Sequence, residues 1–220
     1  MSKKNTLLNA KIYILNKRIS SVKNNNIMLL RQQNMIKWLY GDTSFLPIPP
    51  SEMKKTKQLE FLKKEEDKWG LEMRKLCRSD TTETNKQWTT IVGETIAKEL
   101  LYLYGVENVW KPVIVEGMSP DLETDEAIFE IKSATYYTGG TANEKILGVA
   151  YKYRKVPRLY KKSLMVLCIG QAEQYAREKH LIRTEPVEDD EEGDAFLNYC
   201  KDINIIYTCA TFILDNFIKK

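Results

Sequence analysis

Residues 119–132 read SPDLETDEAIFEIK, and this stretch decides the predicted fold and site. If residues 127–132 form a β-strand, successive side chains alternate between its two faces, so Ile128, Glu130 and Lys132 share one face. A carboxylate and an amine then stand side by side on a segment that is otherwise apolar enough to be buried. Adjacent opposite charges on such a face are unusual for a solvated strand and indicate a site.

Asp121 lies at the start of a short strand that we expect before this one, where its carboxylate can join Glu130 and Lys132. Two carboxylates that converge beside a lysine suit a hard divalent cation such as Mg²⁺, which takes oxygen ligands and keeps several waters. The lysine adds a positive charge that can hold a phosphate group. These are the parts that metal-assisted hydrolysis of a phosphodiester requires.

The spacing of these residues resembles a known signature. Pro120-Asp121, eight intervening residues and Glu130-x-Lys132 are similar to the motif of the PD-(D/E)XK nuclease superfamily, which includes most type II restriction endonucleases. The resemblance implies an α/β fold with a restriction-endonuclease-like core, in which a mixed central sheet is flanked by helices. It also implies catalytic roles for Asp121, Glu130 and Lys132, with Mg²⁺ bound by the two carboxylates and the main-chain carbonyl of Ile131.

Residues 84–104 have the apolar periodicity of a helix, and Gly105 follows as a stop signal. On this helix Glu94 falls at the edge of the apolar arc. Nucleases of the superfamily often open their core with a helix whose glutamate reaches the metal through water, so the resemblance implies that role for Glu94. The alternative is an exposed ion pair between Glu94 and Lys98, one helical turn apart, which contributes little stability.

Three further segments predict the rest of the sheet: residues 110–116 as its first strand, residues 163–170 and residues 204–213. The middle one is a continuous apolar run typical of a strand covered on both faces, and a right-handed crossover would place it parallel to the strand at 127–132. Residues 171–180 should follow as a helix. The acidic run at 185–194, EPVEDDEEGD, favours a solvated loop.

The N-terminal region differs in charge from the rest of the chain. Residues 1–80 carry 17 Lys/Arg and 8 Asp/Glu, a net charge of +9 in a chain whose total is +4. Amphipathic helices are expected here over residues 6–23, over residues 26–39 and from an N-cap at Ser51 to about residue 76. We therefore predict two domains: a helical region over 1–80 for DNA gripping or dimerisation, and a nuclease core over 81–220. A lysine-rich solvated surface would explain the same charge.

The segment after the Glu130 strand is basic and aromatic. Residues 132–162 contain eight Lys/Arg and one acid, with five tyrosines between them, which suits contacts with phosphates and bases. The phrase GGTANEKI at 139–146 also looks like a segment of some type II restriction endonucleases. That resemblance implies that Lys145 faces the scissile phosphate and that five more residues touch DNA: Tyr136, Thr141, Asn143, Lys152 and Arg154. The alternative for each of them, favoured when it is taken singly, is an ordinary surface position.

Cysteine and histidine usage narrows the chemistry. The four cysteines form no CxxC pair, which disfavours zinc and a disulfide framework and suits reduced intracellular thiols. His180 is the only histidine, which disfavours most His-dependent triads and zinc proteases. The apolar start of the chain is interrupted by Asn9 and Lys11, so we expect neither a signal peptide nor a membrane span. A cytoplasmic location is expected, or the host-cell cytoplasm or nucleus for a viral protein.

These observations together predict a Mg²⁺-dependent endonuclease that cuts double-stranded DNA at a short specific sequence, as type II restriction endonucleases do. Cleavage of both strands needs two active sites, so a homodimer is expected. One alternative is a repair or recombination nuclease that recognises DNA structure. The other is a catalytically inactive module of the same fold that binds DNA or another partner.

Overall fold

The computed structural model describes residues 3–77, 87–137, 144–183 and 190–219. The chain folds as two compact units, which we treat separately. The helical unit comprises Met1–Val106 and Thr211–Lys220, and the sheet unit comprises Glu107–Ala210. The chain therefore leaves the helical unit, forms the sheet unit and then returns to the first.

The helical unit is formed by α1 (Lys3–Ser21), α2 (Met35–Leu39), α3 (Lys55–Cys77), α4 (Trp88–Leu103) and most of α9 (Ala210–Lys219). This division differs from the predicted boundary at 80/81, because α4 packs against α3. Residues 80 and 81 themselves lie outside the described residues. The predicted stop at Gly105 is present: its φ is +84°, and Val106 N–H donates to the Leu101 carbonyl at 3.1 Å, as in a Schellman motif.

The predicted helix over residues 26–39 is wrong for most of its length. Only Met35–Leu39 is helical, and Asn34 before it has φ 70°, outside the right-handed region. The main-chain N–H groups of Met28, Leu29 and Leu30 instead donate to the side chain of Glu99. The hydrophobic periodicity of residues 26–39 contains no sign of this long-range contact. The third predicted helix begins at Lys55, so Ser51 does not cap it.

Three tryptophans form the aromatic centre of the helical unit. The ring of Trp38 lies 5.7 Å from those of Trp69 and Trp88, and Trp69 and Trp88 meet edge to face at 6.1 Å. Gly70 lets this cluster close, because a Cβ built there would lie 2.2 Å from the Trp88 ring. The indole N–H of Trp38 donates to the buried Glu66 at 2.8 Å.

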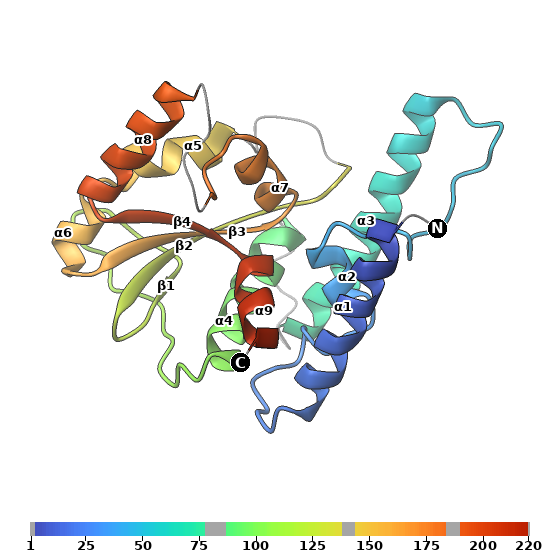
Figure 1. Cartoon of the computed structure of the whole chain (residues 1–220), viewed down its shortest axis with the longest axis horizontal. Helices are drawn as coiled ribbons and strands as arrows, with labels where there is room; N and C mark the ends of the chain where they lie inside the picture. The colour runs from blue at the N-terminus through green and yellow to red at the C-terminus, as the bar shows by residue number, and fades with distance from the viewer. Residues whose placement is uncertain (1–2, 78–86, 138–143, 184–189, 220) are drawn as a thin grey trace. The chain divides into compact units, whose positions relative to one another are not determined.

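The sheet unit contains a four-stranded mixed sheet with helices packed on it (Figure 1). Its elements are β1 (Leu122–Glu123), β2 (Ala127–Ala134), α5 (Glu144–Lys152), α6 (Val156–Tyr160), β3 (Ser163–Gly170), α7 (Gln171–Glu178), α8 (Glu191–Asp202) and β4 (Ile205–Cys209). The order is β1-β2-β3-β4; β1 is antiparallel to β2, whereas β2, β3 and β4 are parallel. The predicted parallel strand over 163–170 is thus confirmed, and the protein is of mixed α/β class.

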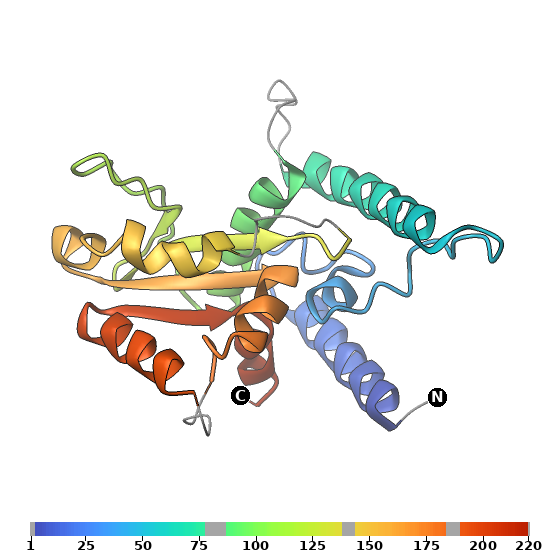
Figure 2. The same ribbon diagram turned by 90° about the horizontal axis from the view of Figure 1, so that it is seen from above.

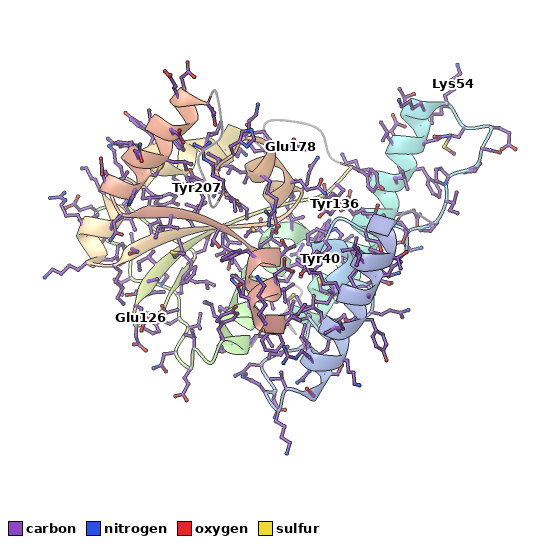
Figure 3. All side chains as sticks on the ribbon, viewed as in Figure 1. Tyr40, Lys54, Glu126, Tyr136, Glu178 and Tyr207 are labelled. Atoms are coloured by element: carbon purple, nitrogen blue, oxygen red, sulfur yellow. The ribbon has the colours of Figure 1, made fainter. Side chains whose placement is uncertain are left out.

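One face of this sheet is covered by helices α5, α7 and α8. Ile128 of β2 packs there with Leu164 and Val166 of β3 and with residues of the three helices. Tyr207 of β4, labelled in Figure 3, is buried in this layer and donates to the main-chain carbonyl of Ile146 in α5 at 3.0 Å. Because side chains alternate along a strand, Glu130 and Lys132 leave β2 on this same face.

The predicted first strand over residues 110–116 is wrong. Trp110 makes one bridge to Glu123, and Val115 pairs with Met118 across a two-residue turn, with nothing longer between them. Both turn residues, Glu116 and Gly117, have positive φ, which suits a tight hairpin. Val113 and Ile114 are 77% and 64% exposed, so the apolar pattern here reflects an exposed arm, seen beside α6 in Figure 2.

Two predictions at the C-terminal side also need correction. The final strand ends at Cys209 rather than at residue 213, and α9 begins directly after it. The second half of the acidic run is helical: the side chain of Asp190 accepts a hydrogen bond from Gly193 N–H, and Glu191, Glu192 and Asp194 lie in the first turn of α8. Acids are favourable there because a helix N-terminus carries partial positive charge.

The four cysteines, Cys77, Cys168, Cys200 and Cys209, form no disulfide bond. No helix within the described ranges combines the length and the apolar character that a membrane crossing requires.

Candidate functional site

The predicted site residues Asp121, Glu130 and Lys132 come together at the β1–β2 hairpin of the sheet unit. Asp121 immediately precedes β1, and its main-chain N–H donates to the Phe129 carbonyl at 2.9 Å. Its carboxylate reaches across to β2, where Oδ2 accepts the main-chain N–H of Ile131 at 2.7 Å. The hairpin itself is closed by Thr124, whose main-chain N–H donates to the Ala127 carbonyl at 2.9 Å. The short turn therefore places Asp121 beside the middle of β2.

Glu130 and Lys132 form an ion pair along β2. Lys132 Nζ lies 2.5 Å from Glu130 Oε1, and the side chains are 24% and 5% exposed respectively. The other oxygen, Glu130 Oε2, is buried and has no hydrogen-bond partner among the described residues. A buried carboxylate oxygen without a partner is costly, and protein interiors rarely keep one. Glu130 therefore retains acceptor capacity that the fold itself does not use.

The pKa of Glu130 is raised above its ordinary value. Burial is the main cause, and the nearby charge of Asp121 acts in the same direction. The positive charges of Lys132 and Lys152 oppose these effects without cancelling them. Burial and the charge of Glu130 also raise the pKa of Tyr153, yet Oε2 of Glu130 keeps no hydrogen-bond partner. The carboxylates of Asp121 and Glu130 thus repel each other where water screens them poorly, and a bound cation would reduce this repulsion.

Further residues that the sequence did not single out complete this group. Lys111 Nζ lies 3.7 Å from Asp121 Oδ1, and the buried Tyr153 accepts a hydrogen bond from Lys152 Nζ at 2.9 Å. Lys152 was expected to touch DNA, whereas here its charge also acts on Glu130. Tyr153 could have been found from its helical spacing to Val149, because both are buried on one face. Lys111 precedes Asp121 by ten residues in an irregular segment, where no periodic signal points to it.

Few carboxylates are available for a metal ion. The described part of the chain contains no group of three or more His, Cys, Asp or Glu side chains placed to hold one. Asp121 and Glu130 nevertheless suit Mg²⁺, which keeps several waters and often binds through only one or two carboxylates. The unpartnered Oε2 of Glu130 is the observation that fits such a ligand. The main-chain carbonyl of Ile131 stays a predicted third ligand.

The other predicted residues are more scattered. Glu94 is half-buried on α4 in the helical unit, and its metal-binding role stays a prediction. Lys145 is exposed on α5, and Tyr136 is half-buried just after β2. Arg154 is exposed and donates to the Tyr151 carbonyl at 2.6 Å. Two more predicted DNA contacts lie outside the described residues, namely Thr141 and Asn143.

Comparisons of the chain with protein-family models, with curated proteins and with solved structures found no match.

Proposed function

We propose that this protein is a Mg²⁺-dependent endonuclease of the PD-(D/E)XK type, with a restriction-endonuclease-like core, which hydrolyses double-stranded DNA at a short specific sequence. The observation that carries the proposal is the convergence of Asp121, Glu130 and Lys132 around a buried carboxylate oxygen that no described residue hydrogen-bonds. The three residues that the sequence spacing singles out lie near one another in the sheet unit, which supports the proposal. A purely structural ion pair would not need the unsatisfied oxygen.

The side chains have distinct roles in this proposal. Asp121, Glu130 and the carbonyl of Ile131 would hold Mg²⁺, which when bound would supply positive charge against the charge that develops on the phosphoryl group. Lys132 is fixed by Glu130 Oε1, so its ammonium can hold a phosphate oxygen and orient the attacking water. The water oxygen bonds to phosphorus and gives up a proton to solvent, and the bond from phosphorus to the 3′ oxygen breaks. The 3′ oxygen takes up a proton from solvent, so the products are a 5′-phosphate and a 3′-hydroxyl.

The proposed substrate is duplex DNA, and the proposed assembly is a homodimer that brings one site to each strand. Lys152 supports the DNA assignment, since it places a second cation beside the acidic pair. Lys145, Tyr136 and Arg154 are proposed to make further contacts with the DNA. Glu94 is proposed to support the metal through water.

The experiment is digestion of plasmid DNA with and without Mg²⁺, followed by sequencing of the cut ends. Asp121→Ala, Glu130→Ala and Lys132→Ala should each lower the cleavage rate by at least about a hundredfold while largely sparing DNA binding, because each removes charge stabilisation at the reacting phosphate. Removal of Mg²⁺ with a chelator should have the same effect. Full cleavage by all three variants would refute the proposal.

A matched control lies two residues from Asp121. Glu123 and Lys162 also form a carboxylate–lysine pair in the sheet unit, with Nζ 2.7 Å from Oε1. Lys162 additionally donates to the Thr124 carbonyl at 2.7 Å, so this pair ties the hairpin to the end of α6. The pair is mostly buried, and Glu123→Gln keeps an oxygen that can accept from Lys162. This variant should therefore leave the cleavage rate within about threefold of the parent protein.

The cut products separate the remaining readings of the sequence. Discrete fragments from a long duplex support recognition of a sequence. Cleavage of branched DNA alone would replace this proposal with a structure-specific nuclease. DNA binding without any Mg²⁺-dependent cleavage would replace it with an inactive binding module.

A further inference from the structure

The exposed arm at residues 110–116 is a part of the sheet unit that the proposed cleavage reaction leaves without a role. After its tight turn the chain comes back through residues 118–120 to Asp121. Lys111 near the start of the arm lies 3.7 Å from Asp121 at the end of this returning segment. Both ends of the arm therefore meet at a residue of the proposed catalytic group, and a ligand bound there would have the arm beside it.

Several contacts fix the arm to the rest of the sheet unit. The hydroxyl of Tyr160, the last residue of α6, lies 2.5 Å from the Val113 carbonyl oxygen and 3.2 Å from that of Met118. One side chain thus holds the arm and the returning segment together. Pro112 and Pro120 are buried, one on each of them, and a proline ring fixes φ. The arm is therefore preformed, so little ordering entropy would be lost on binding.

The outer surface of the arm is apolar. Val113 and Ile114 are 77% and 64% exposed although they are adjacent in the chain. This part of the arm is neither helical nor paired in a strand, and adjacent side chains of such a chain point in different directions. Exposure of both therefore means that the arm stands clear of the protein here. Burial of two neighbouring aliphatic side chains against a partner would be favourable.

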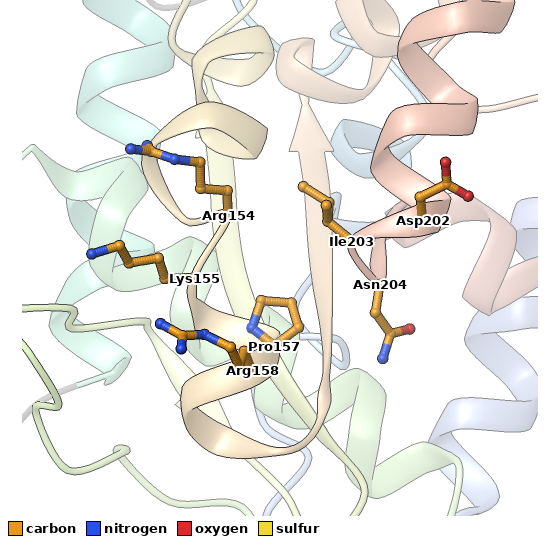
Figure 4. A pocket seen from close by; sticks show the side chains of 7 residues that line it. All are labelled: Arg154, Lys155, Pro157, Arg158, Asp202, Ile203 and Asn204. Carbon is orange, nitrogen blue, oxygen red and sulfur yellow. The ribbon is translucent and has the colours of Figure 1, made fainter.

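Two cations from the segment around α6 lie on the side of the arm. Lys155 Nζ lies 3.9 Å from the carboxylate of Glu116 at the turn of the arm, and both side chains are more than half exposed, so this ion pair is weak. Arg158 is exposed and makes no ion pair with any residue that the structure describes. In Figure 4 the charged ends of Lys155 and Arg158 point to the same side, away from residues 202–204. This is the side on which Lys155 reaches the arm.

We infer that the exposed arm lies in the major groove of duplex DNA, with Val113 and Ile114 against base edges and the two cations against the phosphate backbone. The inference rests on the proposed function for its ligand. The major groove is about 12 Å wide, admits a two-stranded β-ribbon and displays the apolar methyl groups of thymine. At about 3.3 Å per residue the arm extends at most about 17 Å from Lys111 to its turn, which corresponds to about five base pairs.

A second copy of the chain fits this surface less well than DNA does. Most dimers are two-fold, so a contact through the arm would repeat the same patch on both sides. It would bring the cations Lys155 and Arg158 of both copies together, and like charges across an interface repel. DNA phosphates would neutralise them instead. Glu116 is acidic, and within the major groove its carboxylate can accept from the amino group of cytosine.

The test measures binding of the full chain to DNA by fluorescence anisotropy in the presence of a chelator. Two duplexes of about two helical turns are compared: alternating d(AT), in which every base pair carries a thymine methyl group in the major groove, and alternating d(AU), which lacks these groups. The double variant Val113→Ser with Ile114→Ser should weaken binding to d(AT) by about tenfold, because apolar contact with the methyl groups is lost. Binding to d(AU) should weaken by only about threefold.

The cations are tested through the salt dependence of binding. Lys155→Ala and Arg158→Ala should each reduce the slope of log affinity against log salt by about one, because each removes a phosphate contact. The matched controls are Lys201→Ala, an exposed cation on α8, and Ile48→Ser, an apolar residue of the helical unit that is 89% exposed. Both controls should bind as the parent protein does, and circular dichroism verifies that every variant is folded.

Equal affinity of the double variant and the parent protein for d(AT) would overturn the inference, as would an equal loss on the two duplexes or no binding of either duplex by the parent. Sedimentation velocity tests the other occupant: a parent dimer that the double variant converts to monomers would assign the arm to a second copy instead. Arm-dependent binding without Mg²⁺-dependent cleavage would refute the nuclease proposal and leave this inference standing. Cleavage by a parent protein whose affinity does not depend on the arm would refute this inference alone.

Discussion

Glu99 in the helical unit and Glu130 in the sheet unit are both buried glutamates, and they are held in opposite ways. They are 2% and 4% exposed, and burial raises the pKa of each. Glu99 receives three main-chain N–H groups, at 2.9 Å from Met28, 2.7 Å from Leu29 and 2.7 Å from Leu30. Glu130 accepts from one ammonium on Oε1, and no described residue donates a hydrogen bond to its Oε2.

The difference distinguishes a buried carboxylate whose hydrogen bonds stabilise the fold from a buried carboxylate that destabilises it. The donors around Glu99 belong to a segment that is not helical, so their main-chain N–H groups have no helical acceptors. The carboxylate of Glu99 accepts these hydrogen bonds instead. Glu130 has the opposite effect, since a buried carboxylate oxygen without a hydrogen-bond donor destabilises the protein. Residues that cost stability in this way are typical of functional sites. Three predictions test this comparison.

The largest expected effect on stability is that of Glu99→Gln. An amide offers one acceptor oxygen, and its N–H₂ group would face main-chain N–H donors, so the variant should lose about 2 kcal/mol of stability. Hydrogen exchange should show faster exchange at Met28, Leu29 and Leu30. The control is Glu94→Gln on the same helix, where the half-buried side chain should change stability by less than about 1 kcal/mol. Unchanged protection in Glu99→Gln would remove the distinction between the two glutamates.

The second prediction is that Glu130→Gln does not destabilise the sheet unit near pH 8. The change removes a buried charge that Asp121 repels, and this should offset the lost pair with Lys132 and stabilise the unit by about 1 kcal/mol. Hydrogen exchange of peptides from β2 and β3 measures this effect apart from the helical unit. A loss larger than about 1 kcal/mol would assign Glu130 to the same structural class as Glu99.

The smallest expected effect is the pH dependence of that stabilisation. The folded-state pKa of Glu130 lies above its value in the unfolded chain, so the folded protein binds the proton more tightly. Its contribution to stability is present below the unfolded pKa and is lost as pH rises through the folded pKa. The advantage of Glu130→Gln should therefore be greatest at pH 8 and shrink toward pH 4.5. Urea unfolding of both proteins across this range provides the measurement, and a constant difference would contradict the raised pKa.

Much of the sheet unit could be predicted because its signals are local. The apolar run at 163–170 is β3, and alternation along β2 placed Glu130 and Lys132 on one face. The position of Asp121 beside β2 could be predicted because a short hairpin fits the eight residues between Asp121 and Glu130. The sequence could not reveal that Glu99 binds residues about seventy positions earlier, which is why the helix over 26–39 was overpredicted. Nor could alternation alone distinguish the exposed arm at 110–116 from a buried strand.

The chain order of the two units has a consequence for synthesis. Residues 211–220 belong to the helical unit, where Asp215 pairs with Lys11 at 2.7 Å and the Ile213 carbonyl accepts from the Tyr104 hydroxyl at 3.0 Å. On the ribosome, residues 3–103 are therefore translated before the segment that completes their unit, and the sheet unit is translated between the two. A chain that stops after residue 210 should lose order in its earliest helices rather than near the break, and limited proteolysis of that shortened chain would reveal which end is cut.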